Sequence, residues 1–208
     1  MGRPRKHEET QRRAPAQARS KATVEAILEA AARIIRREGE DALTTNRIAE
    51  VAGVGVGSVY GYFPDKAAIQ LALARRMLAS GDAAILDALE GPRTISPTRA
   101  MVRALLTLHA EDKALRRSVM GVHLSRGHRL EHAESTQATV ALIAERLAGW
   151  GFAVDPTRLF IVTRAVLGVA RALVEEPDGS VPGLQVLEDE LMDLVRPYLD
   201  GMPVGALT

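Results

Sequence analysis

The stretch from Leu43 to Lys66, LTTNRIAEVAGVGVGSVYGYFPDK, constrains the fold more than any other part of the sequence. Its first half places the apolar residues Ile48 and Val51 on one helix face, with Thr44 as a good N-cap before them. Gly53 can adopt the positive φ that ends a helix, and the next apolar pattern begins only about three residues later. Two short helices joined by such a tight turn predict a helix-turn-helix.

The second short helix is expected over residues 56–63, because Pro64 then breaks the chain. Val54, Val59 and Phe63 have the spacing that packs this helix against the first one. The remaining residues face solvent or a groove: Val56, Gly57, Ser58, Tyr60, Gly61 and Tyr62. Tyrosine hydroxyls can donate to phosphate oxygens, and small residues let a backbone approach base edges closely, so this face suits DNA.

The glycines of GVGVG also resemble a nucleotide-binding fingerprint. That chemistry needs a strand before the loop and a helix after it, so that backbone amides converge on a pyrophosphate. Here an amphipathic helix precedes the glycines, and no Gly-Lys-Ser/Thr follows. The helix-turn-helix therefore explains more of the residues, while a plain structural role of the tyrosines in sealing a helical core stays open.

Apolar residues recur at helical spacing through the rest of the chain. Residues 20–38 form one such pattern before Gly39, and a long helix is expected from Lys66 through Leu78. Further helices are expected near 82–90, 97–109, 111–123, 128–149, 156–175 and 183–199. No stretch alternates as a strand would, so the fold class is predicted to be all-α, with a three-helix helix-turn-helix domain at 20–66 and a larger helical domain at 67–208.

Composition excludes several classes of protein. The chain of 208 residues has no cysteine, which excludes disulfides and thiolate metal sites. No apolar run approaches the roughly 18–20 residues that span a bilayer, and no secretory signal pattern follows the basic N-terminus, so we expect a cytoplasmic protein without a membrane partner. The net charge is +1, but residues 1–21 carry seven Lys and Arg against Glu8 and Glu9, which favours a polyanionic partner for this end.

Residues 1–19 are polar and are expected to form a flexible basic arm. The arm begins MGRPRK, and Gly-Arg-Pro in a basic context resembles the core of an AT-hook, which lies extended in a narrow minor groove. Arg3, Arg5 and Lys6 would be the inserting residues. A solvated tail that adds only non-specific attraction is the alternative.

The stretch AILEAAARIIRREGEDALTTNRIAEVAGVGVGSVYGYFPDKAAI resembles the DNA-binding domain of the TetR family (TetR/AcrR-like regulators) over roughly residues 23–70. The AGV turn, the VGSVY helix and the YFPDK opening of the next helix carry the resemblance. It implies a DNA-binding transcriptional regulator rather than an enzyme, in most members a repressor that a small-molecule effector releases from its operator. The rest of the chain matches the family only in its helical layout and length.

The resemblance assigns DNA contacts by position. It implies phosphate contacts by Thr45, Tyr60, Tyr62 and Lys66, and positions facing base edges at Asn46, Val56, Gly57 and Ser58. The chain departs from the family pattern at Gly55, where a capping serine is common, and at Gly61, where a longer side chain is common. Interior glycines each weaken a helix by about 1 kcal/mol relative to alanine, so the second short helix must depend on packing against its neighbours.

The resemblance also makes 67–208 a ligand-binding and dimerisation domain. It implies a homodimer through the helices near 156–175 and 183–199, and two copies would place two reading helices on a palindromic operator. Candidate residues for a ligand pocket are Met101, Leu105, His109, Met120, His123, Trp150 and Phe160. Each of these is also a plausible member of an ordinary core.

Two other functions compete with this interpretation. A metal enzyme would need His123, His128 and His132, but Glu131 lies one place late for an HExxH motif, so we expect no metal, no cofactor and no enzymatic activity. An architectural DNA-binding protein that uses its arm and has no effector is the second alternative. The acidic residues around Glu188 are expected to form a solvated helix face.

Overall fold

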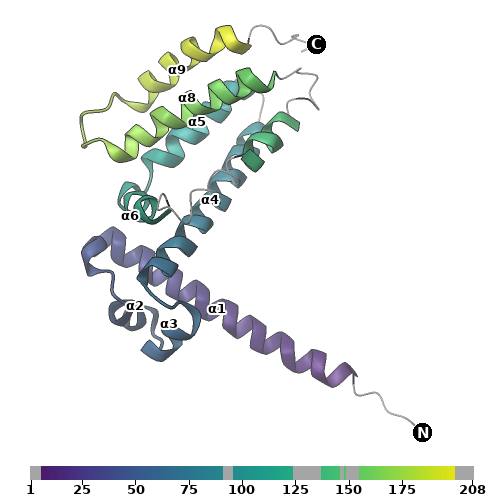
Figure 1. The fold of residues 1–208 in the computed structure, drawn as a ribbon, viewed down its shortest axis with the longest axis vertical. Coiled ribbons are helices and arrows are strands. Elements are labelled where there is room, and N and C mark those ends of the chain that lie inside the picture. Colours follow the sequence, from purple (N-terminus) through teal and green to yellow (C-terminus); the bar gives the residue numbers. More distant parts are fainter. Residues whose placement is uncertain (1–5, 91–95, 124–136, 146–147, 149–154, 200–208) are drawn as a thin grey trace. The chain divides into compact units, whose positions relative to one another are not determined.

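The computed structural model describes residues 6–90, 96–123, 137–145, 148 and 155–199. Among these residues the regular elements are all helices and none is a strand, which confirms the predicted all-α fold class (Figure 1). The elements are α1 (Lys6–Glu38), the short 3-10 helix η1 (Glu40–Ala42), α2 (Thr45–Ala52), α3 (Val56–Tyr62), α4 (Lys66–Glu90), α5 (Pro97–Ala110), α6 (Lys113–His123), α8 (Pro156–Glu175) and α9 (Leu184–Leu199). Residues 137–145 are also helical, so only this part of the helix expected near 128–149, together with residue 148, is described.

The chain divides into two compact units, Met1–Leu73 and Ala74–Thr208. The division falls within α4, after its second turn, whereas the sequence suggested a boundary just before residue 67. Local patterns locate the start of α4 well, but a continuous helix can belong to two units without a break in its sequence signal.

The structure differs from the flexible arm expected over residues 1–19, because α1 already begins at Lys6. Glutamate, glutamine, alanine and arginine make up most of residues 8–19, and all four are good helix formers. This preference outweighs Pro15, which lies inside the helix and lacks the N–H that would bond four residues back. Arg3 and Arg5 lie outside the described residues.

The helix-turn-helix forms where the sequence predicts it. The Thr44 hydroxyl accepts the Arg47 N–H at 3.1 Å, which caps α2, and Gly53 ends α2 in the left-handed region at φ 67°. The core of this unit buries one face of α1, represented by Ile27 and Ile34, against Ile48 of α2 and Val59 of α3. Packing of α1 on α2 and of α2 on α3 therefore holds the short α3 in place.

Helix α4 is continuous through the position near residue 80 where two separate helices were expected. Gly81 lies inside it, and a Cβ at this position would come within 3.0 Å of Leu108 Cδ2 on α5. The glycine therefore permits a close approach of another helix rather than ending its own. Asp65 accepts the Ala68 N–H at 2.8 Å and caps the start of α4, as expected.

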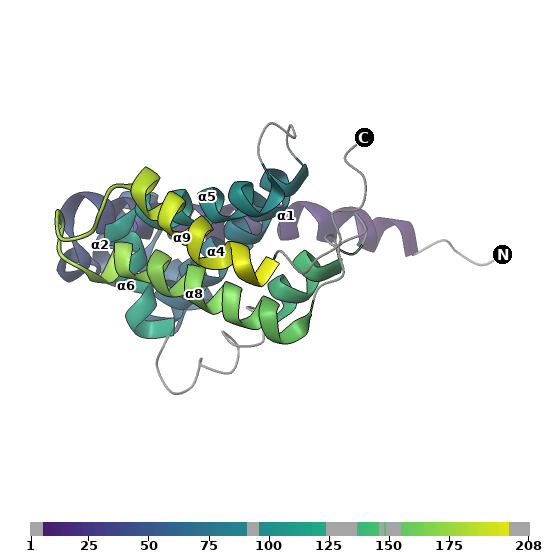
Figure 2. The same cartoon turned by 90° about the horizontal axis from the view of Figure 1, so that it is seen from above.

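In the C-terminal unit, α5, α8 and α9 pack on one another around an apolar core (Figures 1 and 2). Pro97 and Pro156 each stand in the first turn of their helix, behind the capping side chains of Ser96 and Asp155. The core is formed by residues that are almost completely buried, among them Val102, Leu106, Val162, Val166, Ala170, Leu191 and Val195. None of the described helices has the length and apolar character of a membrane span.

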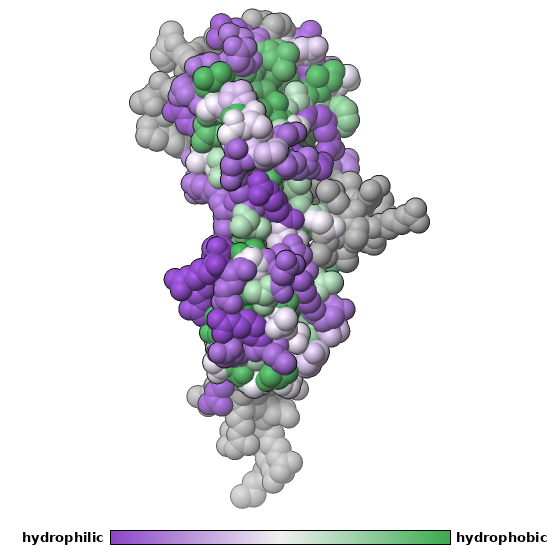
Figure 3. Space-filling model, turned by 90° about the vertical axis from the view of Figure 1, so that its left-hand side faces the viewer, coloured by the Kyte–Doolittle hydropathy of each residue, from purple (hydrophilic) through white to green (hydrophobic). Residues whose placement is uncertain are grey.

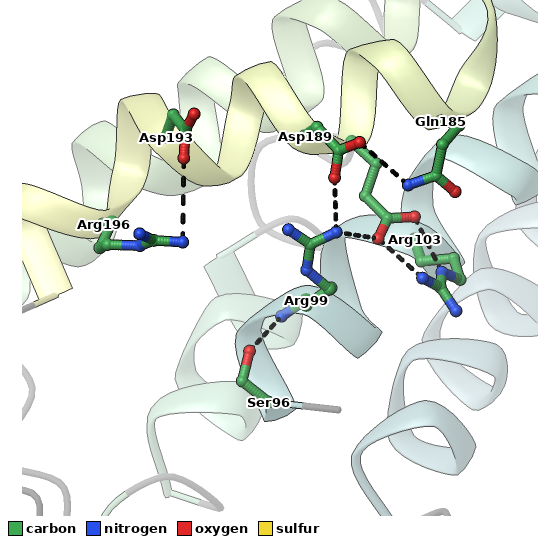
Figure 4. Close-up of polar contacts among 8 residues, drawn as sticks. Ser96, Arg99, Arg103, Gln185, Asp189, Asp193 and Arg196 are labelled. Carbon is green, nitrogen blue, oxygen red and sulfur yellow. Dashed lines mark hydrogen bonds and ion pairs between the residues drawn. The ribbon is translucent and has the colours of Figure 1, made fainter. Parts of the chain in front are cut away.

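An ion-pair network centred on the buried Glu188 joins α5 to α9 and corrects the expectation for this one residue. Glu188 is only 3% exposed, although the acidic residues around it were expected to form a solvated face. Arg103 Nε donates to Glu188 Oε2 at 2.8 Å, and Arg99 donates to both Glu188 (2.9 Å) and Asp189 (2.7 Å), as drawn in Figure 4. Two arginines on the facing helix explain how a carboxylate is tolerated here.

Candidate nucleic-acid interface and internal cavity

Helix α3 has one buried face and one exposed face. Val59 is completely buried and Phe63 is 8% exposed, so these two residues anchor the helix. Tyr60 and Tyr62 are 54% and 40% exposed. The other exposed residues of α3 are Val56, Gly57, Ser58 and Gly61. The exposed set is the one that the sequence assigned to solvent or a groove, and it excludes the alternative in which both tyrosines seal the core.

Helix α2 contributes to the same surface through its first turn. Thr45 Oγ1 and the Tyr60 hydroxyl lie 3.0 Å apart and share a hydrogen bond. Asn46, next along the chain, is exposed. The bond connects the start of α2 to the middle of α3, and it brings together two hydroxyls that the resemblance assigns to phosphate contacts.

The ammonium group of Lys66 contacts Glu40 of the same chain. Its Nζ donates to the Glu40 carbonyl oxygen at 3.3 Å and lies 4.0 Å from the Glu40 carboxylate. The buried Gln70 donates to the same carboxylate at 2.9 Å and orients it. Lys66 thus starts α4 with its charge partly satisfied, a contact that the family pattern did not indicate.

The charge of Arg47 is paired with acidic side chains of its own chain. Arg47 donates to both Glu38 oxygens, at 3.1 and 2.9 Å, and pairs with Glu50 at 2.8 Å. Hydrogen bonds from Arg47 lower the pKa of Glu38, although desolvation opposes the shift. These contacts join the end of α1 to α2 and so fix the scaffold beneath the exposed surface. Of the predicted arm residues, Lys6 is the first residue of α1, and Arg3 and Arg5 lie outside the described residues.

The C-terminal unit contains a cavity of about 280 Å³. Most of its wall is apolar and comes from α4, α5, α6, residues 137–145 and α8, with Leu78, Leu105, Val119, Ile143 and Leu167 as examples. Its polar groups are His109, Arg116, Thr139, Thr163, Arg164 and Arg171. A mostly apolar wall with a few convergent polar groups is typical of small-molecule sites, and the volume is near the lower end of their usual range.

His109 has a defined tautomer in this wall. Its Nδ1–H donates to the Leu105 carbonyl oxygen at 2.8 Å, because a carbonyl can only accept. Burial lowers the pKa of His109, and the positive charges of Arg116 and Arg171 lower it further, although the bond to Leu105 opposes this. In the neutral ring, Nε2 remains as a hydrogen-bond acceptor.

Arg116 is the most unusual polar group of the cavity. Its Nε is buried, and no described residue gives it a hydrogen-bond partner. Burial lowers the pKa of Arg116, while Asp112 and Glu111 act in the opposite direction, and a guanidinium still keeps its charge at neutral pH. Arg171 donates to Glu175 at 2.9 Å, and Arg164 lies 5.3 Å from the Phe160 ring centroid.

The structure brings some of the predicted pocket residues together and separates others. Leu105, His109 and Met120 line the cavity. Met101 is buried in the core around α5 but does not line it. Phe160 is 58% exposed and is not among the residues that line the cavity. Trp150, like His128 and His132, lies outside the described residues, as does the side chain of His123. The arginines of the cavity were missed, because a cation on an amphipathic helix normally indicates a solvated face.

Helices α8 and α9 expose an unusual number of large apolar side chains. The exposed residues are Phe160, Ile161, Leu184, Val186, Leu194 and Tyr198. On the face drawn in Figure 3, the C-terminal unit shows green apolar patches among hydrophilic residues. Apolar surface gathered on two neighbouring helices commonly marks an interaction site.

The fold and the exposed α3 define a helix-turn-helix protein with a separate helical unit that contains a cavity. Comparisons with known proteins agree. A TetR-family transcriptional regulator from Mesorhizobium loti superposes with a TM-score of 0.68 at 19% identity, covering 89% of this chain and 99% of that one. A transcriptional regulator from Rhodococcus gives 0.64 at 19%, covering 90% and 99%. The multidrug binding protein EbrR complexed with ethidium gives 0.62 at 21%, covering 83% and 97%.

At these identities the structural matches show a shared fold. The comparison with curated protein sequences yields no match. Residues 27–73 match the family model of bacterial regulatory proteins of the TetR family. This match confirms the resemblance seen in the sequence: residues 27–73 form a domain similar to the N-terminal domain of that family. DNA-binding transcriptional regulation is the activity that such a domain supports.

Proposed function

We propose that the chain is a homodimeric repressor that binds a palindromic operator and is released from it by a small-molecule effector. The observation that carries the proposal is the exposure of one whole face of α3, with Tyr60 and Tyr62 outward, while Val59 is completely buried. A helix anchored in this way can enter a major groove without unfolding.

The proposed contacts follow the exposed surface of α2, α3 and the start of α4. Phosphates are contacted by Thr45, Tyr60, Tyr62 and Lys66, and base edges by Asn46, Val56, Gly57 and Ser58. Asn46 can form a bidentate pair with adenine, which discriminates by roughly 1–3 kcal/mol. Lys66 must exchange part of its contact with Glu40 for a phosphate, so its contribution is smaller than that of a free lysine.

The exposed apolar residues of α8 and α9 support the homodimer. In the proposed dimer this pair packs against its copy as a four-helix bundle, which covers Phe160 and Leu194, the most exposed large apolar side chains of the two helices. A two-fold axis then relates two α3 helices, and their spacing has to match successive major grooves.

The cavity supports the effector. A ligand that binds better to the form with wrongly spaced reading helices shifts the population away from DNA, by a coupling of about 1–3 kcal/mol in typical cases. The basic N-terminal segment adds affinity through phosphates or a minor groove, so a chain that starts at Gln17 is expected to show a shallower salt dependence of binding.

The test is a fluorescence-anisotropy titration of the full chain against the DNA upstream of its own gene, with excess non-specific competitor. The wild type is expected to bind one palindromic site as a dimer, and Tyr60→Ala/Tyr62→Ala to lose at least about tenfold in affinity. Thr107→Ala, an exposed change on α5, is the matched control. A footprint that spreads without a palindromic centre would instead indicate an architectural protein.

A further inference from the structure

The charges of the cavity are all of one sign. Three guanidinium groups, those of Arg116, Arg164 and Arg171, belong to its wall, and no aspartate or glutamate is among the described lining residues. The remainder of the wall is mainly aliphatic. A ligand that fits must therefore present apolar surface over most of its body and can gain from a negative group.

Arg116 is the arginine of the wall to which we assign that negative group. Its Nε is buried and finds no hydrogen-bond partner among the described residues, whereas a buried donor normally has one. The neighbouring arginines are already engaged, Arg171 with Glu175 at 2.9 Å and Arg164 over the Phe160 ring at 5.3 Å. Arg116 is thus the group in the wall with most to gain from an acceptor.

His109 lines the same cavity as the three arginines. Burial is the main cause that lowers the pKa of His109, and the charges of Arg116 and Arg171 lower it further, so both guanidinium groups lie near this ring. An anion placed there would offset this repulsion, and the neutral Nε2 of His109 could accept a hydrogen bond from a polar group of the ligand. A lipophilic cation would add to the repulsion.

We propose that the cavity binds an apolar monocarboxylate whose carboxylate pairs with Arg116 and whose hydrocarbon body lies against the aliphatic wall. This rests on the proposed function, since it names the chemical class of the effector. One charged head and an apolar body suit a site of about 280 Å³ in which a single guanidinium has a buried donor to spare.

The experiment compares three ligands with the same tail and different heads. Octanoate, 1-octanol and octylammonium are titrated into the full chain by calorimetry at neutral pH and below their micellar concentrations, and 1-naphthoate, 2-naphthol and 1-naphthylmethylammonium form a parallel aromatic series. In at least one series the carboxylate is expected to bind at least about tenfold more tightly than the alcohol, and the cation more weakly than either. The proposal is overturned if in neither series the carboxylate binds more tightly than both its alcohol and its cation, or if both carboxylates fail to bind at millimolar concentration.

Two variants locate the site. Arg116→Met keeps an unbranched apolar side chain like the aliphatic part of arginine and removes the guanidinium charge, so carboxylate affinity is expected to fall to that of the alcohol while alcohol affinity stays unchanged. Arg196→Met, at an arginine that is not part of the cavity wall, is the matched control. A Cβ at Gly168 of the cavity wall meets no atom within 4 Å, so the first atom of a new side chain has space there, and Gly168→Leu is expected to displace carboxylate and alcohol alike. Unchanged carboxylate binding in Arg116→Met overturns the assignment.

DNA binding by the same preparations separates this inference from the proposed function. If the wild type binds carboxylates in the expected order but no operator, the proposed function fails and the ligand class stands. If the operator is bound but the cation is the tightest ligand, the ligand class fails and the proposed function stands. When both hold, the carboxylate is expected to weaken operator binding in the wild type and not in Arg116→Met.

Discussion

The two compact units place their candidate functional groups in opposite ways. In the N-terminal unit most of the groups are neutral and lie at the surface, and Tyr60 and Tyr62 among them are carried on a helix whose other face is anchored by Val59. In the C-terminal unit they line a cavity, and one of them, Arg116, keeps a buried donor without a partner. The first arrangement lowers the free energy of unfolding little, since exposed polar groups keep their hydration. The second costs stability until a ligand supplies the missing contact.

The largest expected effect contrasts two valines of α3. Val59→Asp places an unpaired carboxylate at a completely buried position, which costs several kcal/mol, and is expected to unfold the helix-turn-helix and abolish DNA binding. Val56→Asp, at a position 37% exposed, should leave the free energy of unfolding nearly unchanged but also abolish DNA binding, because its charge repels phosphates. Urea unfolding and anisotropy measure the two quantities. Strong binding by Val56→Asp would show that α3 does not face DNA.

The second largest effect is expected in the C-terminal unit at Glu188, a buried charge that has its hydrogen-bond partners, unlike the carboxylate introduced by Val59→Asp. Glu188→Gln leaves the donors of Arg103 and Arg99 without their carboxylate, and is expected to lower the free energy of unfolding by about 2–3 kcal/mol. The exposed Glu190→Gln on the same helix is the matched control. A loss equal to that of the control would mean that the network does not hold α9 to α5.

The same carboxylate gives a pH dependence of known sign. Hydrogen bonds from Arg103, and then from Arg99, lower the pKa of Glu188 below its ordinary value of 4.5. Its stabilisation is therefore complete above that value and is lost as the pH falls through the lower pKa of the folded state. The difference in unfolding free energy between wild type and Glu188→Gln should shrink between about pH 5 and about pH 2, and a constant difference would contradict the ion pair.

The third effect concerns Arg116 and tests whether this cavity residue lowers the free energy of unfolding when no ligand is bound. Arg116→Met removes a buried unsatisfied donor and its charge, so the free energy of unfolding without ligand is expected to rise by about 1–2 kcal/mol. Arg196→Met, at a side chain 60% exposed, should change it by less than about 0.5 kcal/mol. Urea titration measures both. A lower free energy of unfolding in Arg116→Met would mean that the buried arginine stabilises the C-terminal unit, contrary to the difference between the units described above.

Sequence patterns predicted the N-terminal unit in more detail than the C-terminal one, and the reason is physical. The Thr44 cap, the turn at Gly53 and the buried face at Val59 are each decided by a few neighbouring residues, and all three are found in the structure. The exposed face of α3 follows from them. Local rules therefore suffice where function lies on the surface of a short, capped helix.

The cavity could not be predicted in the same way, because its wall comes from distant segments of the chain. Leu105 and His109 were candidates, but nothing local distinguishes Arg116 from a solvated arginine on an amphipathic helix. Glu188 shows the same limit, since its burial depends on Arg103, 85 residues away in sequence. Gly81 is a third case, because its role in allowing close helix packing depends on Leu108, which lies on another helix and is not adjacent in sequence.

The smallest effect that still tests the contrast is the coupling between Thr45 and Tyr60, whose oxygens lie 3.0 Å apart. Each hydroxyl is a proposed phosphate donor, and the bond between them should hold Tyr60 in position before DNA arrives. In a double-mutant cycle with Thr45→Val and Tyr60→Phe, the loss of operator affinity is expected to be non-additive by about 0.5–1 kcal/mol. Ser58→Ala, also on α3, should combine additively with Thr45→Val. Because both hydroxyls sit at the surface, neither variant should change the free energy of unfolding by more than about 0.5 kcal/mol. An additive cycle would mean that the two hydroxyls act separately on DNA, and a large loss of stability would show that even this exposed surface depends on its internal contacts.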